Sequence, residues 1–160
     1  MIILGIDPGT ATTGYAVVRT DGSRLEVLAC GPIYTTPDLP AAERLNSIYQ
    51  QLDKIIDAHK PDALSIERLF FAKNETTALA VGRASGVVLL LAAQRGLKTE
   101  EYTPLEVKQA VVGYGAADKK QVQFMVTKIL NLAQTPKPDD VADALALCIC
   151  HAHSAKMKSL

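Results

Sequence analysis

Residues 1–22 have the sequence MIILGIDPGTATTGYAVVRTDG, in which two apolar runs flank a short polar segment. The first run predicts a buried strand over residues 1–7 that ends in a carboxylate, and the second predicts a strand over residues 13–20. Asp21-Gly22 is a typical hairpin turn, and the pattern after it predicts a third strand over residues 24–35. This part of the chain is therefore expected to form an antiparallel meander.

Helical and strand patterns alternate in the rest of the chain. The expected helices lie at residues 45–56, 75–94, 104–111, 118–131 and 139–153, and the expected strands at residues 63–67 and 97–102. A meander followed by this alternation predicts an α/β fold with a mixed five-stranded sheet and helices on both faces. The length of 160 residues predicts one domain, residues 1–154, and a short tail at residues 155–160 that could be disordered.

The composition favours a folded protein, because hydrophobic residues make up 48% of the chain and charged residues 21%. The formal net charge is 0, which as a bulk value argues mildly against a nucleic-acid-binding protein. The charge is unevenly distributed, however: residues 21–62 carry seven acids and four bases, whereas residues 102–138 carry five bases and two acids. Residues 68–83 add three bases against one acid. We therefore expect one face of the molecule to be positive.

The three cysteines show no paired spacing, which fits a reducing compartment better than a disulfide framework. The N-terminus carries neither the charged segment nor the cleavage site of a secretory signal. The longest apolar run, residues 84–93, has about ten residues, whereas a bilayer span needs roughly 20. A soluble, cytoplasmic protein with no membrane partner is expected.

Acidic residues stand where two of the predicted strands end. Asp7 ends the first strand and Glu67 ends the fourth, so the two carboxylates meet at one sheet edge if these strands are neighbours. Asp140 and Asp143 are three residues apart on one face of an otherwise apolar helix, which Asp139 is expected to cap. Four converging carboxylates need protons or cations, and oxygen ligands suit Mg²⁺ or Mn²⁺. Two such ions could activate a water and stabilise the leaving oxygen of a phosphodiester.

Each acid also has an ordinary interpretation. Asp7-Pro8-Gly9 could be a simple turn, and Asp140 and Asp143 lie where capping and the helix dipole alone favour aspartate. Glu67 is harder to explain in this way, because glutamate is uncommon in strands and no turn signal surrounds it. The conjunction of all four acids is what favours a site.

Four segments between Ile2 and about His153 carry a shared signal, namely GIDPGTATTGYAVV, IERLFFAKN, VKQAVVGYGAADKKQVQ and DDVADALALCICHAH. Taken together and in this order, they resemble the RuvC-type Holliday-junction resolvases. The resemblance implies a ribonuclease H-like fold and a homodimeric endonuclease that makes paired, symmetric nicks in four-way DNA junctions during recombination and repair. It also implies partnership with branch-migration motor proteins.

The resemblance assigns roles to positions of this chain. It implies that the four acids hold two Mg²⁺ ions per subunit, for which Mn²⁺ could substitute. Lys108 and Lys119 match basic residues that assist phosphate handling, and Phe70 matches an aromatic residue implicated at the junction centre. The expected catalytic residues are Asp7, Glu67, Asp140, Asp143, Lys108 and Lys119. With the basic stretches and the nearby aromatic residues included, the expected DNA-contact residues are Phe70, Phe71, Lys73, Arg83, Tyr114 and Lys120.

Two other classes of protein remain open at this point. The segment GIDPGTATTG also resembles the phosphate loop of sugar kinases and actin-like ATPases. That class clasps its nucleotide between two such domains, and 160 residues supply one. The other alternative is a non-catalytic DNA-binding module on the same fold, which would be expected to lose acids that this chain retains.

Overall fold

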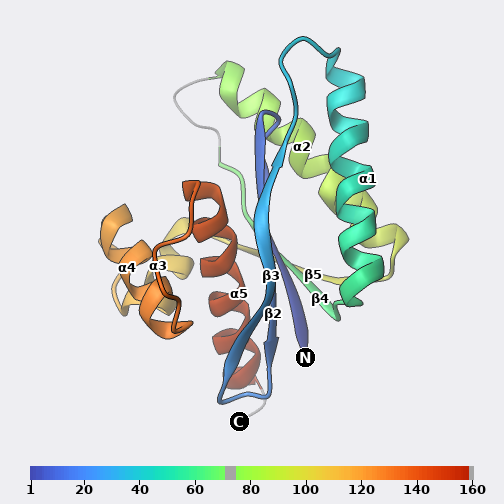
Figure 1. Ribbon diagram of the computed structural model, residues 1–160. Helices are drawn as coiled ribbons and strands as arrows, with labels where there is room; N and C mark the ends of the chain where they lie inside the picture. The colour runs from blue at the N-terminus through green and yellow to red at the C-terminus, as the bar shows by residue number, and fades with distance from the viewer. Residues whose placement is uncertain (71–74, 159–160) are drawn as a thin grey trace.

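The computed structural model describes residues 1–70 and 75–158, which form one mixed sheet with helices on both faces (Figure 1). The five strands are β1 (Ile2–Asp7), β2 (Thr12–Thr20), β3 (Leu25–Tyr34), β4 (Ala63–Glu67) and β5 (Lys98–Tyr102). Their order across the sheet is β3-β2-β1-β4-β5. The first three strands form the expected antiparallel meander, and β4 and β5 run parallel to β1. The α/β class and the mixed five-stranded sheet are thus confirmed.

The helices are α1 (Ala41–His59), α2 (Glu75–Gln94), α3 (Pro104–Val112), α4 (Lys119–Ile129) and α5 (Asp139–Lys158). α1 and α2 cover one face of the sheet, whereas α5 covers the other, with α3 and α4 packed on its outer side (Figure 1). Each helix lies where the sequence predicts one, with ends that shift by a few residues.

The C-terminal end of α5 corrects one expectation. The helix continues to Lys158, so residues 155–158 belong to it and not to a disordered tail. The Lys158 Nζ atom lies 3.3 Å from Glu100 Oε1, and basic residues in the last turn interact favourably with the helix dipole. Both effects extend the helix beyond the point at which its apolar pattern ends.

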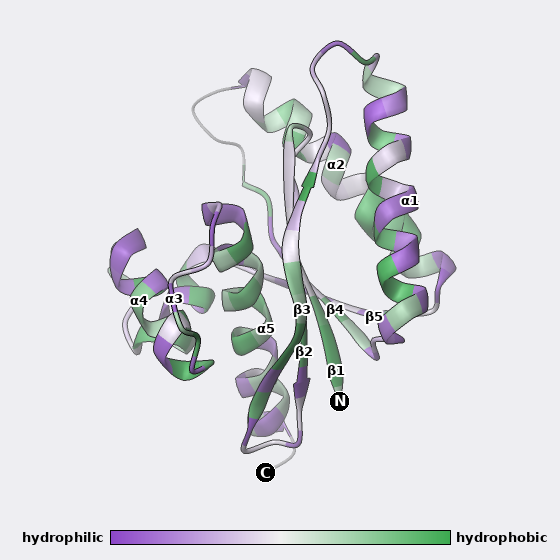
Figure 2. Ribbon diagram, in the orientation of Figure 1, coloured by the Kyte–Doolittle hydropathy of each residue, from purple (hydrophilic) through white to green (hydrophobic). Residues whose placement is uncertain are grey.

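Two apolar cores form because side chains alternate along the strands. Ile3 of β1 points toward α5, where it belongs to the same core as Leu145 and Ile149. Its neighbour Leu4 points the other way, into the core beneath α1 and α2. α5 is hydrophobic along most of its length (Figure 2), and it is buried because it lies between the sheet and the α3–α4 pair.

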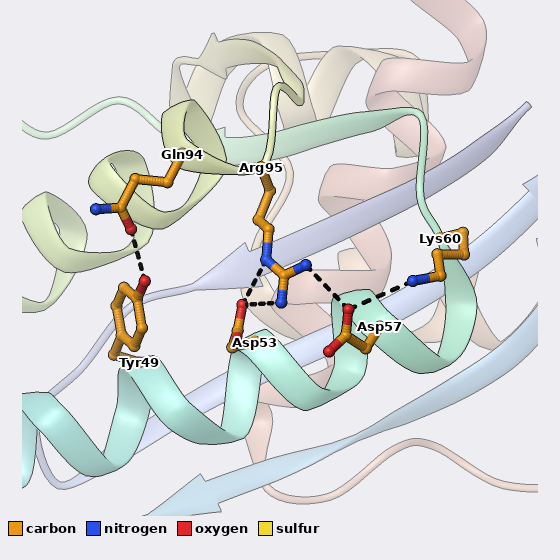
Figure 3. Close-up of polar contacts among 6 residues, drawn as sticks. All are labelled: Tyr49, Asp53, Asp57, Lys60, Gln94 and Arg95. Atoms are coloured by element: carbon orange, nitrogen blue, oxygen red, sulfur yellow. Dashed lines mark hydrogen bonds and ion pairs between the residues drawn. The ribbon is translucent and has the colours of Figure 1, made fainter.

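Polar contacts tie α1 to the C-terminal end of α2 (Figure 3). The Arg95 guanidinium lies 2.6 Å from Asp53 Oδ1 and 2.9 Å from Asp57 Oδ1. The Tyr49 hydroxyl donates a hydrogen bond of 2.6 Å to Gln94 Oε1. These groups lie at the surface, so they contribute little to stability, but they hold the two helices in one arrangement.

α2 has more apolar surface than this chain covers. Leu79 (59% exposed) and Leu90 (56% exposed) lie on one stripe of the helix with Arg83 and Gly86, which are exposed as well. By length and composition alone, α2 is also the one helix among the described residues that could cross a membrane. The apolar run at residues 84–93 is shorter than this helix and did not predict a span of that length. The core helix of a soluble protein passes the same test.

Candidate active site

Asp7 and Glu67 lie side by side at one edge of the sheet. β1 and β4 are parallel neighbours in which Ile6 is paired with Ile66, so the next residue of each strand is an acid. Both acids are half-buried. Strand pairing thus brings together two carboxylates that are far apart in the sequence.

α5 carries its acids to this edge because it lies directly on the backbone of the sheet. Gly14 is the partner of Asp7 across β1 and β2, and a Cβ atom at Gly14 would overlap the backbone carbonyl of Asp140. One turn further along the helix, a Cβ atom at Gly5 would overlap the carbonyl of Ala144. This role of Gly5 and Gly14 was not predicted from the sequence, although glycine inside a strand is a known signal of close backbone approach.

A buried hydrogen bond fixes α5 against β4 as well. Ser65 Oγ donates to the backbone carbonyl of Leu147 at a distance of 2.8 Å. Ser65 precedes Glu67 by two residues on β4, and Leu147 follows Asp143 by about one helical turn on α5. The bond therefore sets the register between the two elements that carry these acids.

The acids act on one another electrostatically. Burial is the main reason why the pKa of Asp7 rises to about 8. The charges of the other three acids raise this pKa as well, as does a side-chain hydrogen bond with Asp140. Burial also raises the pKa values of Glu67 and Asp143, against the opposing charges of nearby lysines. Such a site favours a bound cation, because positive charge relieves the repulsion.

Two lysines reach this region from α3 and α4. The Nζ atom of Lys119, the first residue of α4, lies 3.5 Å from Asp143 Oδ2 and 3.5 Å from Asp139 Oδ2. The expectation that Asp139 caps α5 is wrong, because the helix begins at this residue. Its carboxylate instead pairs with Lys119 and accepts a hydrogen bond of 3.0 Å from Gln123 Nε2. Lys108 of α3 lies nearby, on the wall of the hollow described next.

Acids and lysines share one hollow of about 250 Å³. Five of the six predicted catalytic residues line it, namely Asp7, Glu67, Lys108, Lys119 and Asp143. Asp140 does not line the hollow, and it reaches the site through its hydrogen bond to Asp7. Apolar side chains such as Val107 and Val122 form the rest of the wall. Acidic and basic side chains therefore face one another across the hollow, and apolar side chains form the rest of its wall.

The four acids have the type of donor atom that a hard divalent cation prefers. All four acids offer oxygen donors, which Mg²⁺ and Mn²⁺ prefer, and the raised pKa of Asp7 indicates that positive charge is in short supply. Among the residues that the structure describes, no group of three His, Cys, Asp or Glu side chains stands ready to hold an ion. The donor set thus fits a cation by its chemistry.

Four of the predicted DNA-contact residues are described by the structure, and they lie outside this hollow. Phe70 is 61% exposed and lines a second hollow, of about 680 Å³, together with Arg83 of α2. Tyr114, between α3 and α4, and Lys120 of α4 are exposed as well. Two further predicted contacts lie outside the described residues, namely Phe71 and Lys73.

The family model described as "Crossover junction endodeoxyribonuclease RuvC" matches residues 3–151. Curated proteins of that name from two bacteria are similar to this chain over most of their length. The one from Pelotomaculum thermopropionicum is 56% identical over 153 residues, covering 96% of this chain and 93% of the relative. The one from Alkaliphilus metalliredigens is 54% identical over 160 residues, covering 100% of this chain and 98% of the relative.

Solved structures show the same likeness. The structure of T. thermophilus RuvC in complex with a Holliday junction substrate matches with a TM-score of 0.94 and 37% identity, covering 99% of this chain and 97% of the other. The yeast mitochondrial Holliday junction resolvase Ydc2 matches with a TM-score of 0.69 and 16% identity, covering 98% of this chain and 80% of the other. The second likeness shows the fold alone, and together these structures confirm the fold that the resemblance implied.

Proposed function

The chain belongs to the RuvC family of crossover junction endodeoxyribonucleases, and on this basis we propose that it resolves four-way DNA junctions by paired, symmetric nicks. The observation that carries the proposal is the hollow in which acids from β1, β4 and α5 face lysines from α3 and α4. A relative that binds junctions without cutting them would not need this set of groups. Hydrolysis of a phosphodiester does need them.

In this proposal the four acids hold two Mg²⁺ ions per subunit, for which Mn²⁺ can substitute. When bound, two such ions supply an activated water and stabilise the departing oxygen of the scissile phosphodiester. Asp7 supports the assignment, because its carboxyl group keeps its proton to an unusually high pH and needs a compensating cation in order to ionise.

Lys108 and Lys119 position the scissile phosphate in this proposal. Lys119 stays charged, because Asp143 and Asp139 raise its pKa more than burial lowers it. Lys108 forms no ion pair within the described part of the chain, and it lines the same hollow. Both ammonium groups can therefore pair with phosphate oxygens beside the acids.

Two symmetric cuts require two sites, and we assign the second site to a second copy of this chain. The exposed stripe of α2 supports pairing through that helix, because Leu79 and Leu90 are exposed apolar side chains and Gly86 between them is small. A Cβ atom at Gly82 or Gly86 would meet nothing within 4 Å, so another helix can approach closely there. The family also suggests branch-migration motor proteins as partners. It suggests a cytoplasmic location as well, and the free cysteines fit such a reducing compartment.

Cleavage of a synthetic four-way junction tests the proposal. With Mg²⁺ or Mn²⁺ we expect paired nicks at symmetric positions, and with Asp7→Asn we expect junction binding with cutting reduced by about a thousandfold or more. Glu26→Gln is the matched control, because Glu26 is an exposed acid of β3 whose ion pair is with Arg19. This variant should cut like the wild-type protein.

Two outcomes would favour the other classes of protein. Junction binding without cutting by the wild-type protein in either metal would indicate a binding module. Mg²⁺-dependent ATP hydrolysis in the absence of DNA would indicate a kinase-like protein.

A further inference from the structure

The outer face of α4 carries two cations on either side of an exposed aromatic ring. Lys120, Phe124 and Lys128 are spaced four residues apart, so they lie on one side of the helix, and all three are exposed. Phe124 is 58% exposed, and the Lys128 Nζ atom lies 5.5 Å from the centre of its ring. Val122 and Val126, on the opposite side of the helix, are buried. We call these three exposed residues the α4 outer face.

This face is continuous with the candidate active site. α4 begins at Lys119, whose ammonium group lies among the acids, and Lys120 follows it directly. No acid occurs in α4, so positive charge extends from the site along the outside of the helix. Figure 1 shows α4 on the outer side of α5, away from the sheet. A strand that enters the hollow can therefore continue along this helix.

The surroundings leave these cations available. A shallow hollow of about 380 Å³ lies beside Lys120 and Phe124, against Met125. The polar groups near its rim are engaged with each other: Asp118 accepts a hydrogen bond from the backbone of Gln121, whose side chain accepts one from the backbone of Asp118. Within the described residues, neither Lys120 nor Lys128 forms an ion pair with an acid.

We propose that the α4 outer face binds one duplex arm of the junction next to the cut, an inference that rests on the proposed function. Eight residues of α-helix separate Lys120 from Lys128, a distance of about 12 Å along the axis. Each DNA strand presents one phosphate per 3.4 Å of its axis, so the two cations match phosphates about three to four base pairs apart. Phe124 lies between them, where it contacts deoxyribose and the groove edge.

Duplex DNA is a better occupant than single-stranded DNA or a protein. A single-strand groove relies on several aromatic side chains that stack on successive bases, and this face offers one. A protein-docking patch would be a larger apolar surface, whereas here one ring stands between two like charges. Like charges at a regular spacing favour a polyanion.

Equilibrium binding to a four-way junction, in Ca²⁺ so that the junction stays uncut, tests this assignment. We expect Lys120→Gln and Lys128→Gln each to reduce the slope of log affinity against log salt by about 0.9. When the salt concentration rises from about 50 to about 200 mM, the factor by which each variant loses affinity should therefore be about 3.5 times smaller than the factor for the wild-type protein. Phe124→Ala should weaken binding by about fivefold at every salt concentration, with the slope unchanged.

Neutral phosphates give the sharpest test. Methylphosphonates placed in the arm beside the cut should weaken binding of the wild-type protein. They should weaken binding of Lys128→Gln much less, because this variant already lacks the contact between the Lys128 ammonium group and a phosphate. Lys128→Arg should restore the wild-type response. Lys54→Gln, at an exposed position of α1 on the other face of the sheet, is the matched control and should behave like the wild-type protein.

Other results would overturn the inference. Unchanged salt slopes, or methylphosphonates that act equally on the wild-type protein and on Lys128→Gln, would show that no phosphate contacts this face. Unchanged junction binding together with lost binding to a motor protein would make it a protein-docking surface. A wild-type protein that does not bind junctions at all would instead contradict the proposed function, and this inference with it.

Discussion

The missing side chain of Gly14 lets the backbone of α5 lie directly against the sheet. The backbone of Asp140 occupies the space that a Cβ atom at Gly14 would need, and Gly14 is paired with Asp7 across the sheet. Any displacement of α5 at this point therefore changes the distance between the acids of the helix and the acids of the strands.

We expect Gly14→Ala to weaken Mg²⁺ binding by about tenfold or more while the protein remains folded. An added methyl group at a closely packed position destabilises a protein by about 1–3 kcal/mol, and the first turn of α5 is expected to move away from Asp7 to accommodate it. Isothermal titration calorimetry and the rise in melting temperature on adding Mg²⁺ measure the effect without any DNA.

Gly31→Ala is the matched control for this change. Its Cβ atom would lie 3.3 Å from the ring of Tyr15, a side chain that can move, and it would not touch α5. Wild-type Mg²⁺ affinity in Gly14→Ala would show that this close approach does not position the acids.

At the scale of whole elements, α2 and α5 differ in their surroundings. Both are long and mostly apolar. α5 is covered by the sheet on one side and by α3 and α4 on the other (Figure 1), whereas α2 keeps a stripe of exposed residues. The difference is why we propose α2, and not α5, as the interface between two copies.

We expect Leu90→Glu to raise the dissociation constant of the dimer by about 100-fold, equivalent to about 2.7 kcal/mol, because it places a charge in an apolar interface. Sedimentation equilibrium measures the dissociation constant, and junction cleavage should shift from paired to single nicks. Met157→Glu is the control, because Met157 is 76% exposed in the last turn of α5. A dimer of unchanged stability in Leu90→Glu would place the interface on another surface.

At the scale of the whole molecule, the acids of the site oppose folding when no metal is bound. Asp7 has an ordinary pKa of 3.8, and in the folded protein its pKa is about 8. Above pH 4 the unfolded chain therefore loses a proton that the folded protein retains, so ionisation favours unfolding. The contribution of Asp7 to stability is complete below about pH 4 and is lost as the pH rises through 8.

We expect the free energy of unfolding of the metal-free protein to fall between pH 4 and pH 8, with an upper limit of about 6 kcal/mol from Asp7. Urea denaturation in the presence of EDTA measures it, and Mg²⁺ should reverse the fall. Asp7→Asn should show a much weaker fall, caused by Glu67 and Asp143, whose pKa values are also raised. Equal pH profiles for Asp7→Asn and the wild-type protein would contradict the assignment.

Much of the fold could be predicted from the sequence, because the signals are local. The period of apolar residues and the Asp21-Gly22 turn place the strands and helices to within a few residues. The exceptions are at ends that other elements stabilise, such as the last turn of α5 beside Glu100. Asp139 is a similar case, since α5 begins at this residue and not after it, and its carboxylate pairs with Lys119 and Gln123 of α4.

The sequence by itself determined which residues could form the site, because Asp7 and Glu67 end strands and Asp140 and Asp143 begin a helix. Only the tertiary structure decided how these residues meet. The glycines of β1 and β2 set how closely α5 approaches the sheet, and a hydrogen bond from β4 sets the position of α5 along it. The packing of α4 determines which acids Lys119 can pair with. Distances between segments remote in the chain depend on how backbones and side chains pack, and no local pattern records that packing.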